Sequence, residues 1–305
     1  MIFRSIWMKD NQIGLYLMFG LMTLTLACQR EYVKQDLGLD LDFVNITFED
    51  ESILRDPKER YELDYEFQIM RYEVTQSQFE LVLGYRCQRD KESSFLDVGD
   101  AAAYFVSWNM AANFANEWSS YNDLERCYVC TGFTSSVICA PRSDIEIEDC
   151  KGYRLPTEME WELAARSGTK RDFWTGSGDW VGGNYDSNDC DGESQIMDAV
   201  ENPLLSEMAW YCGNNEEDGP KEVGLLMSNG FGLHDIHGNV WEWMHSGDGF
   251  PYSEGDPNAA NHTERILRGG GFHNNPYDLT LVFRSSYSPT KRLSGYGFRL
   301  AKSLK

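Results

Sequence analysis

The stretch from about residue 170 to residue 300 constrains the fold more than any other part of the chain. It is rich in Gly, Asn, Asp and Trp, and its apolar runs are short. Gly, Asn and Asp favour turns, and short apolar runs do not supply the buried face of a long helix or strand. We therefore expect irregular loops held together by turns and aromatic packing, rather than long regular elements.

The regular elements are expected ahead of that stretch. Alternating apolar residues over 65–69 predict a strand, and Thr75 then caps a short helix. Ser107 is the expected N-cap of a second helix, because apolar side chains recur at helical spacing over residues 108–118. A capping box over residues 157–160 begins a third helix.

Composition excludes some classes of partner. Hydrophobic residues make up 42% of the 305 residues, which is enough for a real core. The net charge of −22 argues against nucleic acid or an anionic membrane surface, since phosphate binding needs Lys and Arg. An acidic surface instead suits basic partners or hard cations such as calcium.

Residues 1–27 are predicted to be a lipoprotein signal peptide. Their apolar stretch is too short for a comfortable membrane span. It ends in LTLAC, which resembles a bacterial lipobox, although Thr25 stands where leucine is usual. The resemblance implies lipidation of Cys28 and attachment to a lipid bilayer of the bacterial cell envelope, with Gln29 favouring the outer membrane. An ordinary signal peptide or a short anchor is the alternative, and Met8 is an alternative start.

The remaining chain divides into an acidic segment and a globular part. Residues 28–62 are acidic and lack long apolar periodicity, which is typical of a tether. Residues 63–305 are the predicted globular domain.

The cysteines after Cys28 are expected to form disulfides, because the protein is predicted to be exported. The candidates are Cys127, Cys130, Cys139, Cys150, Cys190 and Cys212. The first four allow three pairings. We expect Cys190 to pair with Cys212, which leaves Cys87 outside the bridges. A zinc site is the alternative for the C-x-x-C pair over residues 127–130.

Three segments together carry a family resemblance. They are GYRLPTEMEWELAARSG (152–168), GLHDIHGNVWEW (232–243) and the segment from RILRGGGFHNN to GYGFRLA (265–301). With YEVTQSQFE and VSWNMAANFANEWSS, they closely resemble the formylglycine-generating enzyme (sulfatase-modifying factor) family over roughly residues 65–303. The resemblance implies an α+β fold of the C-type-lectin-like kind, with little regular secondary structure and structural calcium.

The resemblance does not extend to the family's copper site. The type enzyme oxidises a sulfatase cysteine to formylglycine with copper held by two cysteines just after a GGS turn. Aligning RGGGF on that turn puts Asn274 and Leu279 at the two cysteine positions and Gly271 at the serine. An amide and an isobutyl group do not replace the thiolates that bind soft Cu(I). We therefore expect neither a copper site nor oxidative formylglycine formation.

The family's calcium loop matches better. By position, its ligands would be a side-chain oxygen of Asp235, the backbone carbonyls of Gly238 and Val240, and the Glu242 carboxylate. Hard oxygen donors and a glycine at the bend suit calcium. The alternative is that Asp235 and Glu242 only cap turns.

The family's pocket is expected beside the glycine turn. Trp241 and Trp243 alternate, so that one can face the core while the other, taken as Trp241, lines the pocket. Gly271, His273 and Asn274 are expected to line it as well. No nucleophile or orienting partner is recognisable for His273, so no catalytic residue is assigned.

These observations favour a membrane-tethered exported protein that acts as a binding or accessory module. Its ligand would be a protein, a peptide or a glycan. The alternatives are a divergent oxidase of protein cysteine and a periplasmic modification enzyme of other chemistry. Iron-dependent members of the family rely on a histidine-bearing helical domain ahead of this module, and residues 28–62 are short and contain no histidine.

Overall fold

The computed structural model describes residues 39, 41–47, 63–88, 95, 99–176, 190, 204–215, 219–247 and 264–305. Residues 41–305 form one compact unit. Across the described ranges, no helix is both long and apolar enough to cross a membrane. The predicted signal peptide and Cys28 lie outside the described residues.

The three predicted helices are confirmed, and each begins at its expected capping residue. They are α2 (Gln76–Leu83) after Thr75, α3 (Trp108–Tyr121) after Ser107 and α4 (Glu158–Arg166) after Thr157. At α4, the Glu160 amide donates to Thr157 Oγ1 (3.2 Å), and the Thr157 amide donates to Glu160 Oε2 (2.7 Å). The shorter helical turns are α6 (Leu205–Met208), η1 (Thr134–Ser136) and η2 (Ile147–Asp149).

A three-stranded sheet joins the two ends of the compact unit. It contains β1 (Phe43–Ile46), β2 (Phe67–Met70) and β11 (Ala301–Ser303), and β2 pairs antiparallel with both neighbours. β2 is the strand predicted from the alternating residues. β1 falls in the stretch predicted to be a tether, so the folded part starts ahead of residue 63.

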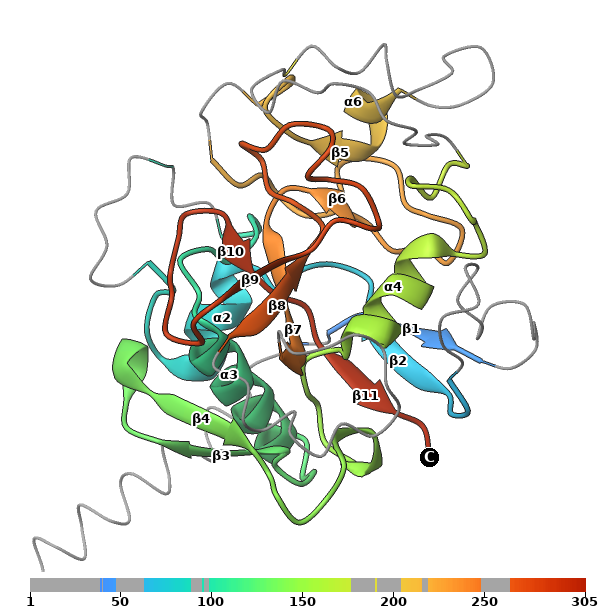
Figure 1. Ribbon diagram of the computed structural model, residues 1–305. Coiled ribbons are helices and arrows are strands. Elements are labelled where there is room, and N and C mark those ends of the chain that lie inside the picture. The colour runs from blue at the N-terminus through green and yellow to red at the C-terminus, as the bar shows by residue number, and fades with distance from the viewer. Residues whose placement is uncertain are drawn as a thin grey trace, which may run out of the picture. The chain divides into compact units, whose positions relative to one another are not determined.

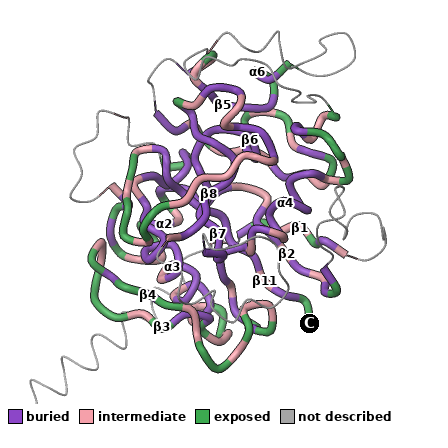
Figure 2. Tube along the Cα trace, in the orientation of Figure 1, coloured by how far each residue is buried: buried purple, intermediate pink, exposed green. Residues whose placement is uncertain are grey.

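The second sheet lies between α3 and α4 (Figure 1). Its order is β10 (Tyr296–Gly297), β7 (Trp241–Gly247), β8 (Arg265–Arg268), β9 (Ser285–Tyr287). Trp108 Nε1 of α3 donates to Met244 O, and Trp161 Nε1 of α4 donates to Glu242 Oε2, both at 2.9 Å. Both helices are therefore fixed to β7, and Figure 2 shows how completely β7, β8 and α4 are buried.

Two small sheets complete the described strands. β3 (Tyr128–Thr131) and β4 (Ile138–Pro141) form an antiparallel hairpin. β5 (Ala209–Trp210) and β6 (His237–Gly238) form a short parallel pair. The long loops between these elements agree with the irregular architecture expected from the composition.

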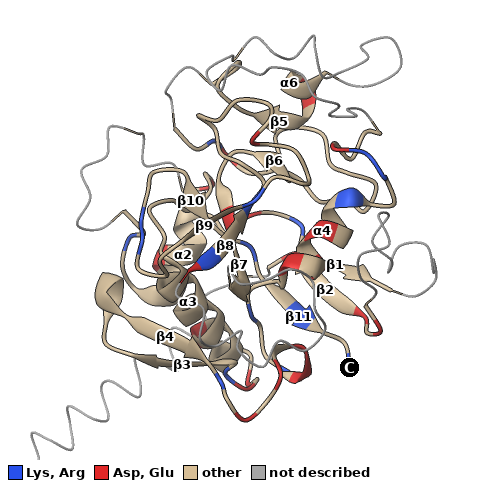
Figure 3. Ribbon diagram, viewed as in Figure 1, with Lys and Arg blue, Asp and Glu red and all other residues tan. Residues whose placement is uncertain are grey.

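The core contains ion pairs as well as apolar side chains. Phe67, Ile69, Trp161 and Ile266 belong to a buried cluster that joins the two larger sheets to α4. Buried Arg–Glu pairs also lie in the interior, and Figure 3 shows acidic positions on α4, which carries Glu160 and Glu162, and basic positions on β8, which carries Arg268. They are Arg154–Glu160, Arg166–Glu162, Arg268–Glu162 and Arg299–Glu242, with N–O distances of 2.6 to 2.7 Å.

Three disulfides confirm that the cysteines pair rather than form a zinc site. They are Cys127–Cys150, Cys130–Cys139 and Cys190–Cys212, so the expected third bridge is correct. Cys87 is buried and belongs to none of the three, as expected, and its thiol donates to the Gln88 side chain (3.2 Å).

Candidate functional site

The glycine turn after β8 holds Asn274 against Trp241. Gly269 and Gly270 have φ angles of +91° and +76°, in the region that favours glycine. A Cβ on Gly270 would lie 3.0 Å from the Asp278 carbonyl oxygen, so the turn has no room for a side chain there. Trp241 Nε1 and the Gly271 amide both donate to Asn274 Oδ1, at 2.8 and 3.1 Å. Trp241, Gly271 and Asn274 therefore lie together. That they line the family's pocket stays a prediction.

The Asn274 amide is fully engaged in this arrangement. Its Nδ2 donates to Asp278 Oδ2 at 2.7 Å, and Asn275 Nδ2 donates to the same oxygen at 3.3 Å. Burial raises the pKa of Asp278, although the bond from Asn274 partly offsets this. Asp278 is a polar residue of this site that the sequence reasoning missed.

Leu279, at the second position assigned to a copper cysteine, belongs to the core. It packs in a buried cluster with Phe173, Leu205, Met208 and Tyr211. Its backbone carbonyl oxygen accepts a hydrogen bond from Nδ1 of buried His237 (2.7 Å). The Asn274 side chain thus belongs to a hydrogen-bond network, and the Leu279 side chain belongs to an apolar cluster.

His273 lies at the edge of the turn and remains accessible to solvent. Its ring packs edge-on against Phe272 (4.9 Å between centroids), and its Cε1 would lie 2.7 Å from a Cβ on Gly295. Partial burial lowers the pKa of His273, and the carboxylate of Asp278 acts in the opposite direction. The sequence predicted His273 as a pocket residue, and the structure places it next to the Asn274 turn.

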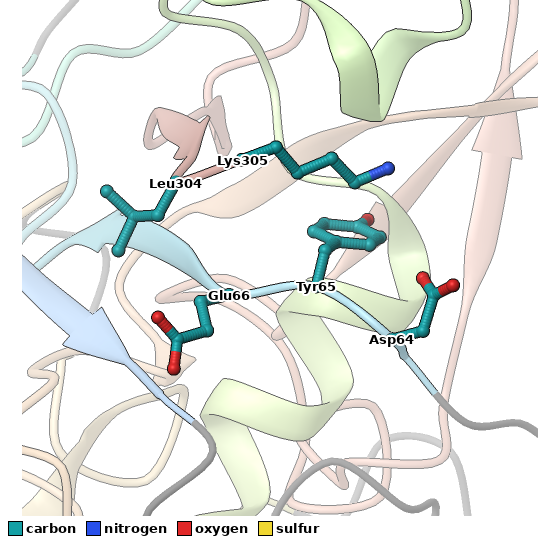
Figure 4. Close-up of a pocket in the computed structure, with 5 residues that line it drawn as sticks. All are labelled: Asp64, Tyr65, Glu66, Leu304 and Lys305. Carbon is teal, nitrogen blue, oxygen red and sulfur yellow. The ribbon is translucent and has the colours of Figure 1, made fainter.

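A cavity is present at a different place, beside the sheet of β1, β2 and β11. It has a volume of about 530 Å³ and is lined by Asp64, Tyr65, Glu66, Leu304 and Lys305 (Figure 4). Lys305 Nζ lies 4.6 Å from the centre of the Tyr65 ring and pairs with Asp149 at 2.9 Å. Its charge therefore already has structural partners, and we assign this cavity no function.

The predicted calcium loop, residues 235–242, includes β6 and extends into the start of β7, and its two acids differ in environment. The Gly224 amide donates to Asp235 Oδ2 (2.7 Å), while Asp235 Oδ1 is buried and has no hydrogen-bond partner among the described residues. Glu242 instead accepts from Arg299 Nε and Nη2 (2.7 and 2.8 Å) and from Trp161 Nε1 (2.9 Å). Asp235 thus offers an oxygen to a cation, and Glu242 already has a cationic partner.

A third buried carboxylate, that of Glu73, faces the same loop. It accepts from the Val240 amide (3.1 Å) and from Asn239 Nδ2 (2.5 Å). Burial raises its pKa well above the usual value, and the charges of Asp235 and Glu242 add to this effect. Glu73 and Arg299 were missed by sequence reasoning, although both lie in the quoted segments YEVTQSQFE and GYGFRLA.

The acidic side chains of the loop suit a hard cation by their charge, but these side chains do not surround one point. Within the described part of the chain, no group of three or more His, Cys, Asp or Glu side chains converges on one point. Asp235 Oδ1 has no partner, and burial together with the neighbouring acids raises the pKa of both Glu73 and Asp235, so a bound cation would favour their charged forms. A cation there would therefore need backbone carbonyls, as the sequence predicts for Gly238 and Val240.

Comparisons with known proteins agree with this architecture. A family model described as "Sulfatase-modifying factor enzyme 1-like domain" matches residues 35–304. The chaperone protein LppX of Paenibacillus barcinonensis is 30% identical over 249 residues, which cover 78% of this chain and 80% of that protein. The formylglycine-generating enzyme of Mycobacterium tuberculosis is 36% identical over 106 residues, 35% of this chain and 31% of the enzyme.

A solved structure extends the likeness to three dimensions. Treponema denticola variable protein 1 has a TM-score of 0.54 and 27% identity, with 78% of this chain and 84% of that chain covered. The fold is thus the predicted α+β, C-type-lectin-like one.

Proposed function

The chain belongs to the sulfatase-modifying factor enzyme 1-like family, and from that premise we propose that it is a binding or accessory protein rather than an oxidase. The observation that carries this proposal is the environment of Asn274 and Leu279. Both polar atoms of the Asn274 amide have hydrogen-bond partners, and Leu279 is buried in an apolar cluster. Neither side chain provides the thiolate that soft Cu(I) requires.

The cysteine next to this turn is Cys212, and its sulfur is already bonded. The Cys212 amide donates to the Asn274 carbonyl oxygen (3.1 Å), while its sulfur pairs with Cys190. A disulfide sulfur is not a thiolate, so Cys212 does not substitute for the missing ligands while this bridge is intact.

A protein partner is the ligand class that we favour. The relative that matches over 78% of this chain and 80% of its own length is named a chaperone protein. Its match covers a larger share of both chains than the match to the mycobacterial enzyme does. A chaperone binds other proteins, and we propose that this chain binds a protein as well.

The proposal places the protein outside the cytoplasm, tethered to the outer membrane through lipidated Cys28. Three disulfides support an oxidising compartment, because cytosolic thiols are kept reduced. Mass spectrometry of the mature N-terminus tests the tether, since an unmodified Cys28 would contradict it.

The proposal also includes a structural calcium ion held by Asp235, the carbonyls of Gly238 and Val240, and Glu242. Asp235 Oδ1, which has no hydrogen-bond partner among the described residues, and the clustering of three buried acids support it, because a cation would relieve the repulsion between their charged forms. Glu242 would share its carboxylate between the ion and Arg299. When bound, the ion would neutralise charge and stabilise the loop, and no reaction step depends on it.

Two measurements on the full-length chain, purified in detergent, test the accessory function. The first is anaerobic Cu(I) titration against a chromophoric chelator, followed by oxygen uptake with a cysteine-containing peptide. We expect no stoichiometric Cu(I) binding and no uptake, and either result in the opposite direction would contradict the proposal. The second is the thermal aggregation of citrate synthase as a model client, which we expect the protein to delay.

A further inference from the structure

We propose that the outer face of the β3–β4 hairpin binds a short apolar segment of a partner protein. This inference rests on the proposed function for the class of partner, but the surface is separate from the Asn274 turn. Three apolar side chains carry it, because they are unusually open to solvent. Phe133 at the tip is 84% exposed, Val129 is 60% exposed and Ile138 is 52% exposed.

The strand register places the exposed side chains together. Val129 pairs with Ala140, and Thr131 pairs with Ile138. Side chains alternate along a strand, so these four residues share one face of the hairpin, and all four are exposed. We call these four residues, together with Phe133 in the connection between β3 and β4, the hairpin face.

The opposite face of the hairpin is fixed to the domain. The Cys130–Cys139 disulfide links the two strands, and the Cys127–Cys150 disulfide anchors their base. Asn116 of α3 donates to Tyr128 O (2.8 Å) and accepts from the Tyr128 amide (3.1 Å). The hairpin face is therefore presented on a rigid support, which lowers the entropic cost of binding.

The hydrogen bonds from α3 also decide how a partner binds. Asn116 occupies the outward-facing backbone groups of Tyr128 on β3, and the Cys139 amide on β4 donates to Asn109 Oδ1 (3.0 Å). A partner strand that joined either edge would have to replace these bonds. The structure therefore favours side-chain packing on the face over strand addition at the edge.

The charge of the hairpin selects an uncharged partner segment. Residues 128–141, YVCTGFTSSVICAP, contain no Asp, Glu, Lys or Arg, although charged residues make up 25% of the chain and its net charge is −22. Figure 3 shows these two strands without acidic or basic positions. A basic protein surface would find no complementary charge on the hairpin. Apolar side chains that pack there would bury no charged group, so binding would not incur the free-energy cost of removing a charge from water.

The size of the face favours a short segment over a second copy of this chain. An aromatic side chain presents about 150–250 Å², so the exposed parts of Phe133, Val129 and Ile138 sum to on the order of 350 Å². That value falls in the range of functional surface patches but below the roughly 800 Å² per partner of a stable interface. The partner that fits this face is therefore an apolar stretch of a client protein that is not yet folded, because an unfolded chain exposes such stretches.

The experiment compares three forms of the full-length protein in detergent. The test variant combines F133S, V129T and I138T, in which threonine keeps the β-branched shape that suits a strand. The matched control is L225S, because Leu225 is as exposed (59%) and apolar but lies outside the hairpin. The probes are a fluorescein-labelled peptide of alternating leucine and serine, a Gly-Ser peptide of equal length, and heat-aggregating citrate synthase.

We expect the triple variant to bind the leucine-serine peptide at least tenfold more weakly than wild type and L225S, and to lose the delay of aggregation. The wild type and the triple variant should bind the Gly-Ser peptide equally weakly, because this peptide has no apolar side chains. Equal activity of wild type and the triple variant would overturn the hairpin inference and leave the accessory function standing. Failure of the wild type in both assays would overturn both.

Two further measurements separate other occupants of the face. Sedimentation of the wild type should show a monomer, and a dimer that the triple variant abolishes would assign the face to a second copy instead. Flotation with phosphatidylcholine vesicles, done without detergent on unlipidated Cys28→Ser forms of the wild type and the triple variant, should not distinguish the two hairpins. A loss of flotation in the triple variant would assign the face to lipid and overturn the proposal.

Discussion

His237 makes the domain sensitive to acid at the scale of a single residue. Its side chain is fully buried, and burial lowers its pKa from 6.5 to about 4. An unfolded chain therefore takes up the proton more readily than the folded one. The contribution of His237 to stability is fully present above about pH 6.5 and is lost as the pH falls through 4. At about 1.4 kcal/mol per pKa unit, the loss amounts to roughly 3 kcal/mol.

Urea unfolding followed by tryptophan fluorescence between pH 7.5 and 4 measures this loss. His237→Asn retains a donor for the Leu279 carbonyl but does not titrate, so its stability should fall less steeply with pH than that of the wild type. His234→Asn is the matched control, since His234 is not fully buried, and it should follow the wild type. An unchanged slope in His237→Asn would show that another group, such as buried His245, dominates.

At the scale of the element, α4 combines a helix cap with a buried charge. Glu160 completes the capping box and also forms a two-point ion pair with Arg154, in which both side chains are fully buried (2.6 and 2.7 Å). Glu160→Gln leaves the Arg154 charge buried without its partner, and we expect a loss of about 3 kcal/mol or more in the free energy of unfolding.

The chain offers its own control in α2. Thr75 and Gln78 form the same capping box, but Gln78 carries no charge and supports no buried arginine. Gln78→Ala should cost about 1 kcal/mol or less, as a cap alone does. Equal losses in the two variants, measured by urea unfolding at pH 7.5, would mean that the buried pair adds nothing beyond the cap.

The elements that can be predicted from the sequence are those with a local signal. Ser107 and Thr157 revealed their helices because a capping residue and an apolar period of 3.6 lie within one short segment. β5, β6 and β10 have two residues each, too few for any periodic signal. These strands exist only because the folded loops bring their backbones together.

Some contacts of the candidate site could likewise be predicted from the sequence, and others could not. The resemblance assigns Trp241 and Asn274 to one pocket, and the two side chains do form a hydrogen bond, although the pocket itself stays a prediction. The pair of Arg299 with Glu242 was not predictable, because these residues are 57 positions apart and only the tertiary fold joins them. Likewise, nothing in the sequence shows that Leu279 faces an apolar cluster.

At the scale of the whole molecule, Arg299 connects the predicted calcium loop to the sheet that joins the two ends of the compact unit. Its Nη1 donates to the carbonyl of Met70 at the end of β2 (3.0 Å), and its Nη2 donates to the carbonyl of His234 (2.8 Å). The ion pair with Glu242 extends this connection to β7. Any change in the charge of the loop should therefore alter the stability of the entire domain.

Calcium is accordingly expected to raise the melting temperature of the full-length protein. At a concentration 100-fold above its dissociation constant, a ligand adds about 2.7 kcal/mol, or about 5–10 °C for a domain of this size. Asp235→Asn should remove that increment, and it is a cleaner test than a change at Glu242, which would also break the pair with Arg299. Asp278→Asn, which alters an acid outside the loop, should keep it. If calcium and EGTA give equal melting temperatures for the wild type, the loop holds no calcium and Asp235 only accepts the hydrogen bond of the Gly224 amide.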